Sequence, residues 1–188
     1  MGRVSREQAE ENRRRVVETA SRLFREQGTH VSVAELMKAS GLTHGGFYKQ
    51  FASKEALVDE ATAHAFGQLT QSHRDVSPHG ADEPDATRRA FIDTYLSVAH
   101  RDDAADGCPV AGLATDIARG GDEGGEARRV YTAGVRAFAD RLTTDDQDGI
   151  TSLCTLLGAL VLARATKGDP LSEEILATAR AALTEDLA

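Results

Sequence analysis

The side chains that could recognise another molecule gather between residues 43 and 54. Hydroxyl and ammonium groups bind phosphate oxygens, and lysine and histidine side chains can also reach the edges of bases. Small residues among them would let the backbone approach a nucleic acid closely. The group consists of Thr43, His44, Gly45, Gly46, Tyr48, Lys49 and Lys54. This composition predicts contacts with phosphates and bases.

Residues that usually carry catalysis or hold metals show no comparable grouping. The chain has six histidines and two cysteines, and none of them has the spacing of a zinc site. No nucleophile is paired with a base, and no glycine-rich phosphate loop occurs. We therefore expect neither an enzyme nor a bound metal or cofactor.

The two cysteines lie in different settings. Cys108 stands where a helix is expected to begin, and a helix N-terminus lowers the pKa of a thiol. Two interpretations of Cys108 stay open, a sensor of oxidants or electrophiles and a buried, inert core residue. Cys154 lies in an apolar run and is expected to pack in a core.

Two short helices joined by a sharp turn would position the polar group. Ser32 can cap a helix that ends at Gly41, and Thr43 can begin a second helix that reaches about Gln50. This spacing predicts a helix-turn-helix over residues 32–51, with the polar side chains on the outer face of its second helix. A structural corner without a nucleic-acid partner is the alternative.

Helical periodicity continues along the rest of the chain. A first helix ends at Gly28, a long helix follows Ser53, and residues 75–84 form a loop. The next helix is expected to turn Phe91, Thr94, Tyr95 and Val98 inward. Strand-like alternation is absent, so we expect an all-α fold of about nine helices. Residues 1–54 would form a helix-turn-helix head of three helices, and residues 55–188 a helical body.

Composition and charge agree with a protein that works in the cytoplasm. The start of the chain has no apolar segment of a signal peptide, and the run 153–163 is too short for a membrane span of about 20 residues. We therefore expect no membrane contact. Residues 1–54 carry 10 Lys and Arg against 6 Asp and Glu, giving +4, whereas the whole chain is −8. A basic head on an acidic body would orient the approach to DNA, although a basic tail without a partner would look the same.

The residues around the turn carry a resemblance to a known family. They are Gly28, Ser32, Leu36, Gly41-Leu42-Thr43, Phe47-Tyr48, Phe51, Ser53-Lys54-Glu55 and Leu57. This pattern resembles the DNA-binding domain of the TetR family of bacterial regulators. The resemblance implies DNA contacts from Ser32, Thr43, His44, Gly45, Gly46, Tyr48, Lys49 and Lys54. Two adjacent glycines each weaken a helix by about 1 kcal/mol, so we expect this helix to become firmer on DNA.

The same resemblance implies a body that dimerises and binds a ligand. The last two helices, where small residues are frequent, would pair across a two-fold axis, although a core pair within one chain is the alternative. The expected interface is Leu153, Leu157, Leu160, Val161, Ile175, Leu176, Ala179 and Leu183. The expected pocket is lined by Phe91, Tyr95, Cys108, Leu113, Ile117, Tyr131 and Phe138, each of which could instead be core. The run 153–163 is apolar on almost every face, so its helix is expected to be buried all round.

Taken together, these features predict a transcriptional regulator of the TetR type. The expected protein is a repressor that binds a palindromic, double-stranded operator as a homodimer. An unidentified small-molecule effector, mostly apolar, would release it. The helix that follows Ser53 is the expected lever between the pocket and the head. An enzyme and an architectural DNA-binding protein without an effector are the two alternative classes.

Overall fold

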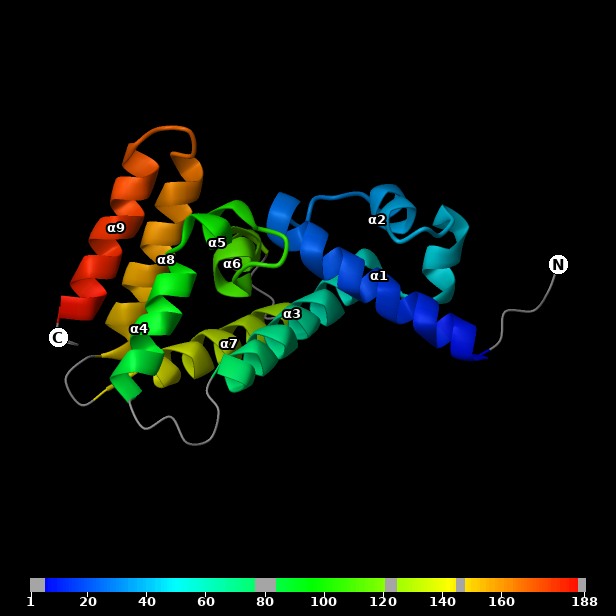
Figure 1. Ribbon diagram of the computed structural model, residues 1–188. Helices are drawn as coiled ribbons and strands as arrows, with labels where there is room; N and C mark the ends of the chain where they lie inside the picture. The colour runs from blue at the N-terminus through cyan, green and yellow to red at the C-terminus, as the bar shows by residue number, and fades with distance from the viewer. Residues whose placement is uncertain (1–5, 77–83, 121–124, 145–147, 186–188) are drawn as a thin grey trace.

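The chain folds entirely into helices and turns. The computed structural model describes residues 6–76, 84–120, 125–144 and 148–185, and within them there is no strand (Figure 1). The helices are α1 Arg6–Gln27, α2 Val33–Ala39, the 3-10 helix η1 His44–Lys49, α3 Lys54–Val76, α4 Pro84–Tyr95, α5 Val98–Asp102, α6 Pro109–Arg119, α7 Glu126–Leu142, α8 Gly149–Ala165 and α9 Leu171–Thr184. The predicted all-α fold is confirmed.

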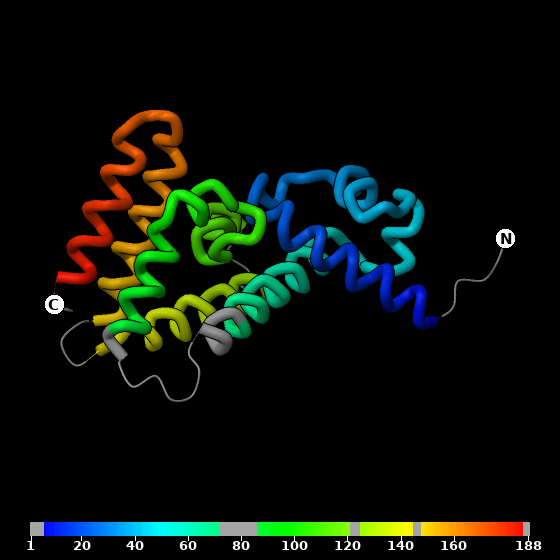
Figure 2. Tube along the Cα trace, in the orientation of Figure 1, coloured from blue at the N-terminus to red at the C-terminus, as the bar shows by residue number. Residues whose placement is uncertain are grey.

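The head forms around one face of α1. Val16, Ala20 and Phe24 recur at helical spacing and are almost fully buried against α2, η1 and the start of α3. Gly28 has a φ of +88°, which ends α1 in the left-handed conformation that glycine adopts freely. The head and the α4, α8 and α9 bundle occupy opposite ends of the molecule, and Figure 2 follows the chain between them.

Helices α3 and α7 run side by side between the two ends. Gly134 of α7 lies directly against the ring of Phe66 on α3, so the two helices approach closely. The body core continues from Phe66 into α4, α8 and α9. The predicted division at residue 54 falls at the start of α3, and that helix runs on into the body.

Helix α6 joins the body to the head. Its Leu113 and Ile117 pack in the same cluster as Phe24 of α1. The Asp116 carboxylate accepts a hydrogen bond of 2.9 Å from the backbone N–H of Thr29, in the turn that follows α1. The head and the body therefore share a core.

Two predicted features of the helices need correction. Val98 does not continue the helix of Phe91 and Tyr95, because the Ser97 hydroxyl caps a new helix by accepting from the His100 N–H at 3.1 Å. Val98 and Thr94 are therefore exposed. Helix α8 is not buried all round, since Cys154, Val161 and Leu162 reach the protomer surface.

The loop predicted over residues 75–84 overlaps the neighbouring helices at both of its ends. Asp75 and Val76 belong to α3, and Pro84 begins α4. Residues 77–83 lie outside the described residues. Among the helices that the structure describes, none has the length and apolarity to cross a membrane.

Candidate nucleic-acid interface and interior cavity

Helix α2, the first helix of the predicted nucleic-acid interface, is stabilised at its N-terminus by a capping box. The Ser32 hydroxyl accepts from the Glu35 N–H at 3.2 Å, and the Glu35 carboxylate accepts from the Ser32 N–H at 2.9 Å. This reciprocal cap satisfies two N–H groups at the start of the helix. The Ser32 hydroxyl also lowers the pKa of the Glu35 carboxyl. Gly41 then turns the chain with a φ of +70°.

The second element of the motif, η1, is wound as a 3-10 helix. Its hydrogen bonds span three residues, as in the 2.9 Å bond from the Gly46 N–H to the Thr43 carbonyl. Adjacent glycines disfavour a regular α-helix by about 1 kcal/mol each, which accounts for this short, tight winding. The predicted helix is therefore present with a different winding.

Aromatic packing fixes which face of η1 points outward. Phe47 is fully buried and stacks on Phe51 with 5.4 Å between ring centroids, while the ring edge of Tyr48 meets it at 5.1 Å. The Tyr48 side chain is 69% exposed. Thr43, His44, Gly45 and Lys49 are exposed as well, and Gly46 is half-buried near Met37. Most of the predicted polar group is thus accessible at the surface of η1 and beside it.

Lys54 occupies the first position of α3, beside this face. A positive charge there opposes the helix macrodipole, so stability alone does not account for the lysine. The same helix start offers N–H groups and a partial positive charge to an anion. Lys54 also borders a cavity of about 290 Å³ between the head and the body, with Ile117 and Arg128 on its far side.

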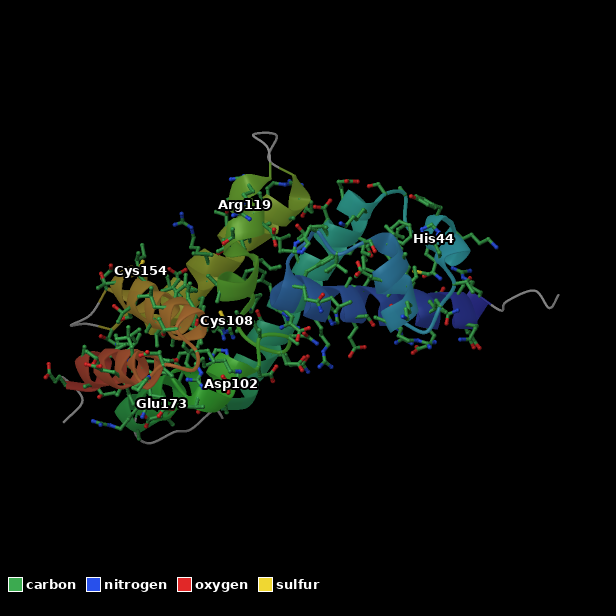
Figure 3. The ribbon with its side chains drawn as sticks, turned by 90° about the horizontal axis from the view of Figure 1, so that it is seen from above. His44, Asp102, Cys108, Arg119, Cys154 and Glu173 are labelled. Carbon is green, nitrogen blue, oxygen red and sulfur yellow. The ribbon has the colours of Figure 1, made fainter. Side chains whose placement is uncertain are left out.

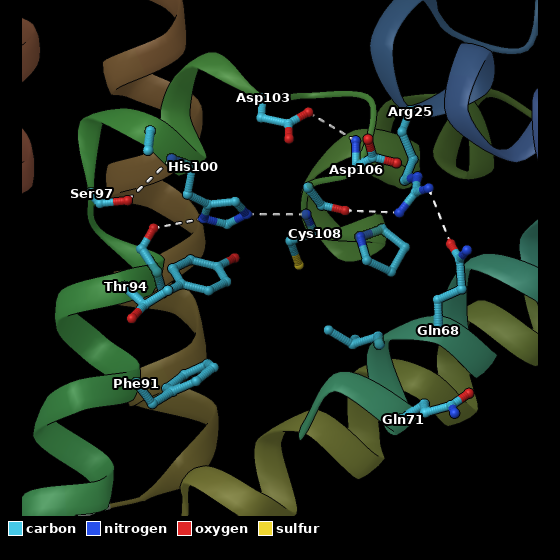
Figure 4. Close-up of a pocket in the computed structure, with 15 residues that line it drawn as sticks. Arg25, Gln68, Gln71, Phe91, Thr94, Ser97, His100, Asp103, Asp106 and Cys108 are labelled. Carbon is cyan, nitrogen blue, oxygen red and sulfur yellow. Dashed lines mark hydrogen bonds between the residues drawn. The ribbon is translucent and has the colours of Figure 1, made fainter. Parts of the chain in front are cut away.

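A larger cavity of about 700 Å³ lies in the body, where α3, α4, α5 and the start of α6 meet. Figure 4 shows Phe91, Thr94 and His100 on one wall, Gln68 and Gln71 on the opposite wall, and Cys108 between them. Its lining is Arg25, Gln68, Leu69, Gln71, Phe91, Thr94, Tyr95, Ser97, Ala99, His100, Asp103, Asp106, Gly107, Cys108 and Pro109.

Three of the seven predicted pocket residues line this cavity, namely Phe91, Tyr95 and Cys108. The other four lie elsewhere. Leu113 and Ile117 pack in the head cluster, and Phe138 lies in the body core behind Phe91. Tyr131 directs its hydroxyl to the Val110 carbonyl at 2.8 Å. For Leu113, Tyr131 and Phe138 the protomer agrees with the packed core, the alternative considered from the sequence, whereas Ile117 is half-buried and borders the smaller cavity.

Several polar lining residues were not anticipated. Arg25 comes from the last turn of α1, where the sequence favours a solvent-exposed side chain, yet it is buried. Its guanidinium donates to the Gly107 carbonyl at 3.1 Å and to Gln68 at 3.3 Å. Burial lowers the pKa of Arg25. Contacts between residues this far apart in sequence leave no local signal.

The titratable groups around Cys108 are held neutral. Burial raises the pKa of the Cys108 thiol and raises that of the neighbouring Tyr95 hydroxyl well above its usual value. Burial lowers the pKa of His100. A thiol with a raised pKa is a poor nucleophile, so in this conformation the geometry favours the inert interpretation of Cys108.

The predicted dimer residues divide between the core and the surface. Leu153, Leu160, Leu176 and Leu183 are buried within the protomer, so their side chains are unavailable to a second copy. Leu157, Ile175 and Ala179 are half-buried, and Val161 is exposed. Cys154 was expected in a core, but Figure 3 shows it on α8 at the opposite end of the molecule from His44, and it is exposed.

Metal ligands do not gather in the described part of the chain. There, no group of three or more His, Cys, Asp or Glu side chains could hold a metal ion.

Sequence comparison identifies relatives of the head. Residues 16–61 match the family described as "Bacterial regulatory proteins, tetR family". Over 61 residues the chain is 38% identical to the HTH-type transcriptional regulator AcrR of Shigella flexneri, covering 32% of this chain and 28% of AcrR. Over 94 residues it is 27% identical to the HTH-type transcriptional repressor KstR2 of Mycobacterium tuberculosis, covering 50% of this chain and 47% of KstR2. The alignments thus span less than half of these relatives.

Solved structures share the whole fold. A TetR-family regulator from Agrobacterium tumefaciens superposes with a TM-score of 0.77 at 19% identity, covering 94% of this chain and 98% of that one. AibR, solved with isovaleryl coenzyme A and operator DNA, superposes with a TM-score of 0.62 at 18% identity, covering 91% and 97%. The fold, including the helix-turn-helix, is that of the TetR family, and the resemblance predicted from the sequence is confirmed.

Proposed function

We propose that this chain, a DNA-binding transcriptional regulator of the TetR family, is a dimeric repressor released from a palindromic operator by a small molecule. The molecule would bind in the 700 Å³ cavity of the body. KstR2, one of its relatives, is named a repressor, and AibR was solved with both an acyl coenzyme A and operator DNA.

The outward face of η1 carries the DNA-binding part of the proposal. Tyr48 and Lys49 project from a helix that the buried Phe47 ring anchors in the head. The Tyr48 hydroxyl and the Lys54 ammonium can donate to phosphate oxygens, and Lys49 can reach base edges. Such a surface would bind duplex DNA generally and prefer particular sequences through Lys49.

Three substitutions separate phosphate contacts from base contacts. A duplex selected from a random library and a scrambled duplex of equal length serve as probes in gel shifts. Tyr48→Phe and Lys54→Ala should weaken binding to both duplexes, because they remove phosphate contacts while the Phe47 packing remains. Lys49→Ala should weaken binding to the selected duplex more, by about 1–3 kcal/mol for a lost base contact.

A body substitution provides the matched control. Lys167→Ala removes a lysine that pairs with Asp102 at 3.1 Å, far from the head, and should leave DNA affinity unchanged. Circular dichroism establishes that each variant is folded. Wild-type affinity in all three head variants would refute the proposed DNA surface.

The cavity is well placed to influence the head. Arg25 of α1 and Gln68 of α3 both line it, and both helices also build the head. A ligand can release DNA only if it binds the released conformation better than the operator-bound one. The proposal therefore expects compounds that fill the cavity to lower operator affinity, whereas an architectural protein would show no such dependence.

Exposed apolar side chains on α8 support the dimer. Ile150, Val161 and Leu162 are large hydrophobic residues at the surface of the protomer. A symmetric dimer would cover the same patch on both copies and present two heads to two half-sites of DNA. The proposed interface uses these residues with Leu157 and Ala179, in place of the four buried leucines.

A further inference from the structure

One buried group in the cavity wall lacks an oxygen or nitrogen partner. Tyr95 is 5% exposed, and among the described residues its hydroxyl pairs only with the Cys108 sulfur and with no oxygen or nitrogen atom. A thiol sulfur is a weak hydrogen-bond acceptor. Buried polar groups in proteins are nearly always paired, and an exception points to a ligand or a bound solvent molecule.

The neighbouring polar groups are already committed to other partners. His100 Nδ1 donates to the Tyr95 carbonyl at 2.7 Å, and its Nε2 accepts from the Cys108 N–H at 3.2 Å. The Arg25 guanidinium is a donor that cannot accept a proton from a hydroxyl. Within the described residues these groups offer the Tyr95 hydroxyl no oxygen or nitrogen acceptor, so an acceptor stronger than the Cys108 sulfur would come from a ligand.

Charged groups of both signs surround the cavity. Arg25, Asp103 and Asp106 lie on its lining, and Asp106 pairs with Arg22 at 2.8 Å. Arg164 adds a positive charge near the side chains of Tyr95 and Cys108. Charge therefore does not select the occupant, and the Tyr95 hydroxyl and the apolar wall define its chemistry.

The remaining wall is aromatic and aliphatic. Phe91 lies 5.7 Å from Tyr95 and 5.9 Å from Phe138, measured between ring centroids, and this cluster faces the cavity through Phe91 and Tyr95. Leu69 of α3 belongs to the same lining. Aromatic walls of this kind favour flat, apolar ligands that stack or pack edge to face.

We infer that the cavity selects a molecule with an aromatic body and one oxygen that accepts a hydrogen bond from the Tyr95 hydroxyl. A carbonyl, ether or hydroxyl oxygen satisfies this requirement. The effector role of the molecule rests on the proposed function, whereas its binding chemistry does not.

Two naphthalenes with nearly the same skeleton test the inference by calorimetry. They are 2-acetylnaphthalene, which carries an acceptor oxygen, and 2-ethylnaphthalene, which has none. The wild type should bind the ketone about tenfold more tightly than the hydrocarbon, as one hydrogen bond from a buried donor implies.

Two tyrosine variants locate the effect. Tyr95→Phe keeps the ring against Phe91 and should bring the ketone-to-hydrocarbon affinity ratio close to one. Its melting temperature without ligand should change little, because the lost hydroxyl has only the Cys108 sulfur as a partner. Tyr131→Phe is the matched control, because the Tyr131 hydroxyl donates to the Val110 carbonyl and not to a ligand. This variant should retain the wild-type ratio of ketone to hydrocarbon affinity.

Each other outcome counts against the inference. A ketone-to-hydrocarbon affinity ratio that survives in Tyr95→Phe, or no binding by either compound, overturns it. Gel shifts with the same compounds judge the proposed function separately. Ketone binding at Tyr95 without any change in DNA affinity would contradict the effector role and leave the assigned site standing.

Discussion

At the scale of single residues, His100 ties two stretches of backbone together. One ring nitrogen bonds the last residue of α4, and the other bonds the N–H of Cys108 ahead of α6. This arrangement requires a neutral ring, with the proton on Nδ1 and a free electron pair on Nε2. Protonation of Nε2 would replace an acceptor with a donor facing another donor.

Protonation of His100 therefore predicts a loss of stability in mild acid. The unfolded histidine has a pKa near 6.5, and burial lowers the pKa in the folded protein. Below pH 6.5 the unfolded chain takes up a proton that the folded chain does not, so the free energy of unfolding falls until the folded pKa is reached. Urea denaturation at pH 7.5, 6.5 and 5.5 measures this dependence. His100→Gln should reduce it, and His30→Gln, which alters an exposed histidine, should retain it.

At the scale of elements, the local capping signals predicted the helix ends well. Ser32 with Glu35, Gly28 and Gly41 each act within a few residues, and each stands at the expected helix end. Two features were not predicted, because in each of them two local structures compete and the sequence pattern does not show which is more stable. Gly45 and Gly46 favour a 3-10 helix over an α-helix, and Ser97 starts a new helix where Val98 was expected to continue the old one.

The candidate sites divide in a similar way. Most of the exposed residues proposed to contact DNA lie on or next to one short element, so the sequence alone placed them close together. The cavity combines Arg25, Gln68 and His100 from three separate helices, and only tertiary packing brings them together. For α8, the sequence predicted an apolar helix. Because nearly every position is apolar, the pattern did not distinguish the side of Leu160, which faces the core, from the side of Val161, which is exposed.

The crossing of α3 and α7 gives a prediction about element packing. A Cβ added at Gly134 would lie 2.2 Å from the buried Phe66 ring, so the two helices would have to move apart. Gly134→Ala should lower the free energy of unfolding by about 1–3 kcal/mol, as overpacking does. Gly67→Ala, on α3 with nothing within 4 Å, should instead raise it by up to about 1 kcal/mol. Chemical denaturation of both variants tests this contrast, and equal effects would contradict the close crossing.

At the scale of the whole molecule, the positive net charge and the exposed apolar side chains of α8 lie at different ends. Residues 1–54, with 10 Lys and Arg against 6 Asp and Glu, carry +4, and the chain as a whole carries −8. The basic head would face DNA while the acidic body turns away from it. The exposed side of α8, far from the head, is then free to meet a second copy (Figure 1).

The proposed dimer predicts a large effect from one surface charge on α8. Val161 is 46% exposed, so a glutamate there should be tolerated by the folded protomer. In a two-fold dimer it would bury an unpaired charge in both copies, which costs about 3–5 kcal/mol for a comparable broken pair. Val161→Glu should therefore sediment as a monomer at micromolar concentration and lose affinity for the selected duplex.

A second exposed valine controls for surface charge in general. Val98 is 43% exposed but lies on α5, outside the α8 patch, so Val98→Glu should remain a dimer with wild-type DNA affinity. A wild type that sediments as a monomer, or a Val161→Glu variant that stays dimeric, would exclude this face as the interface. Loss of the dimer in Val161→Glu should weaken binding to a duplex with two half-sites far more than to one with a single half-site, because only a dimer engages both at once.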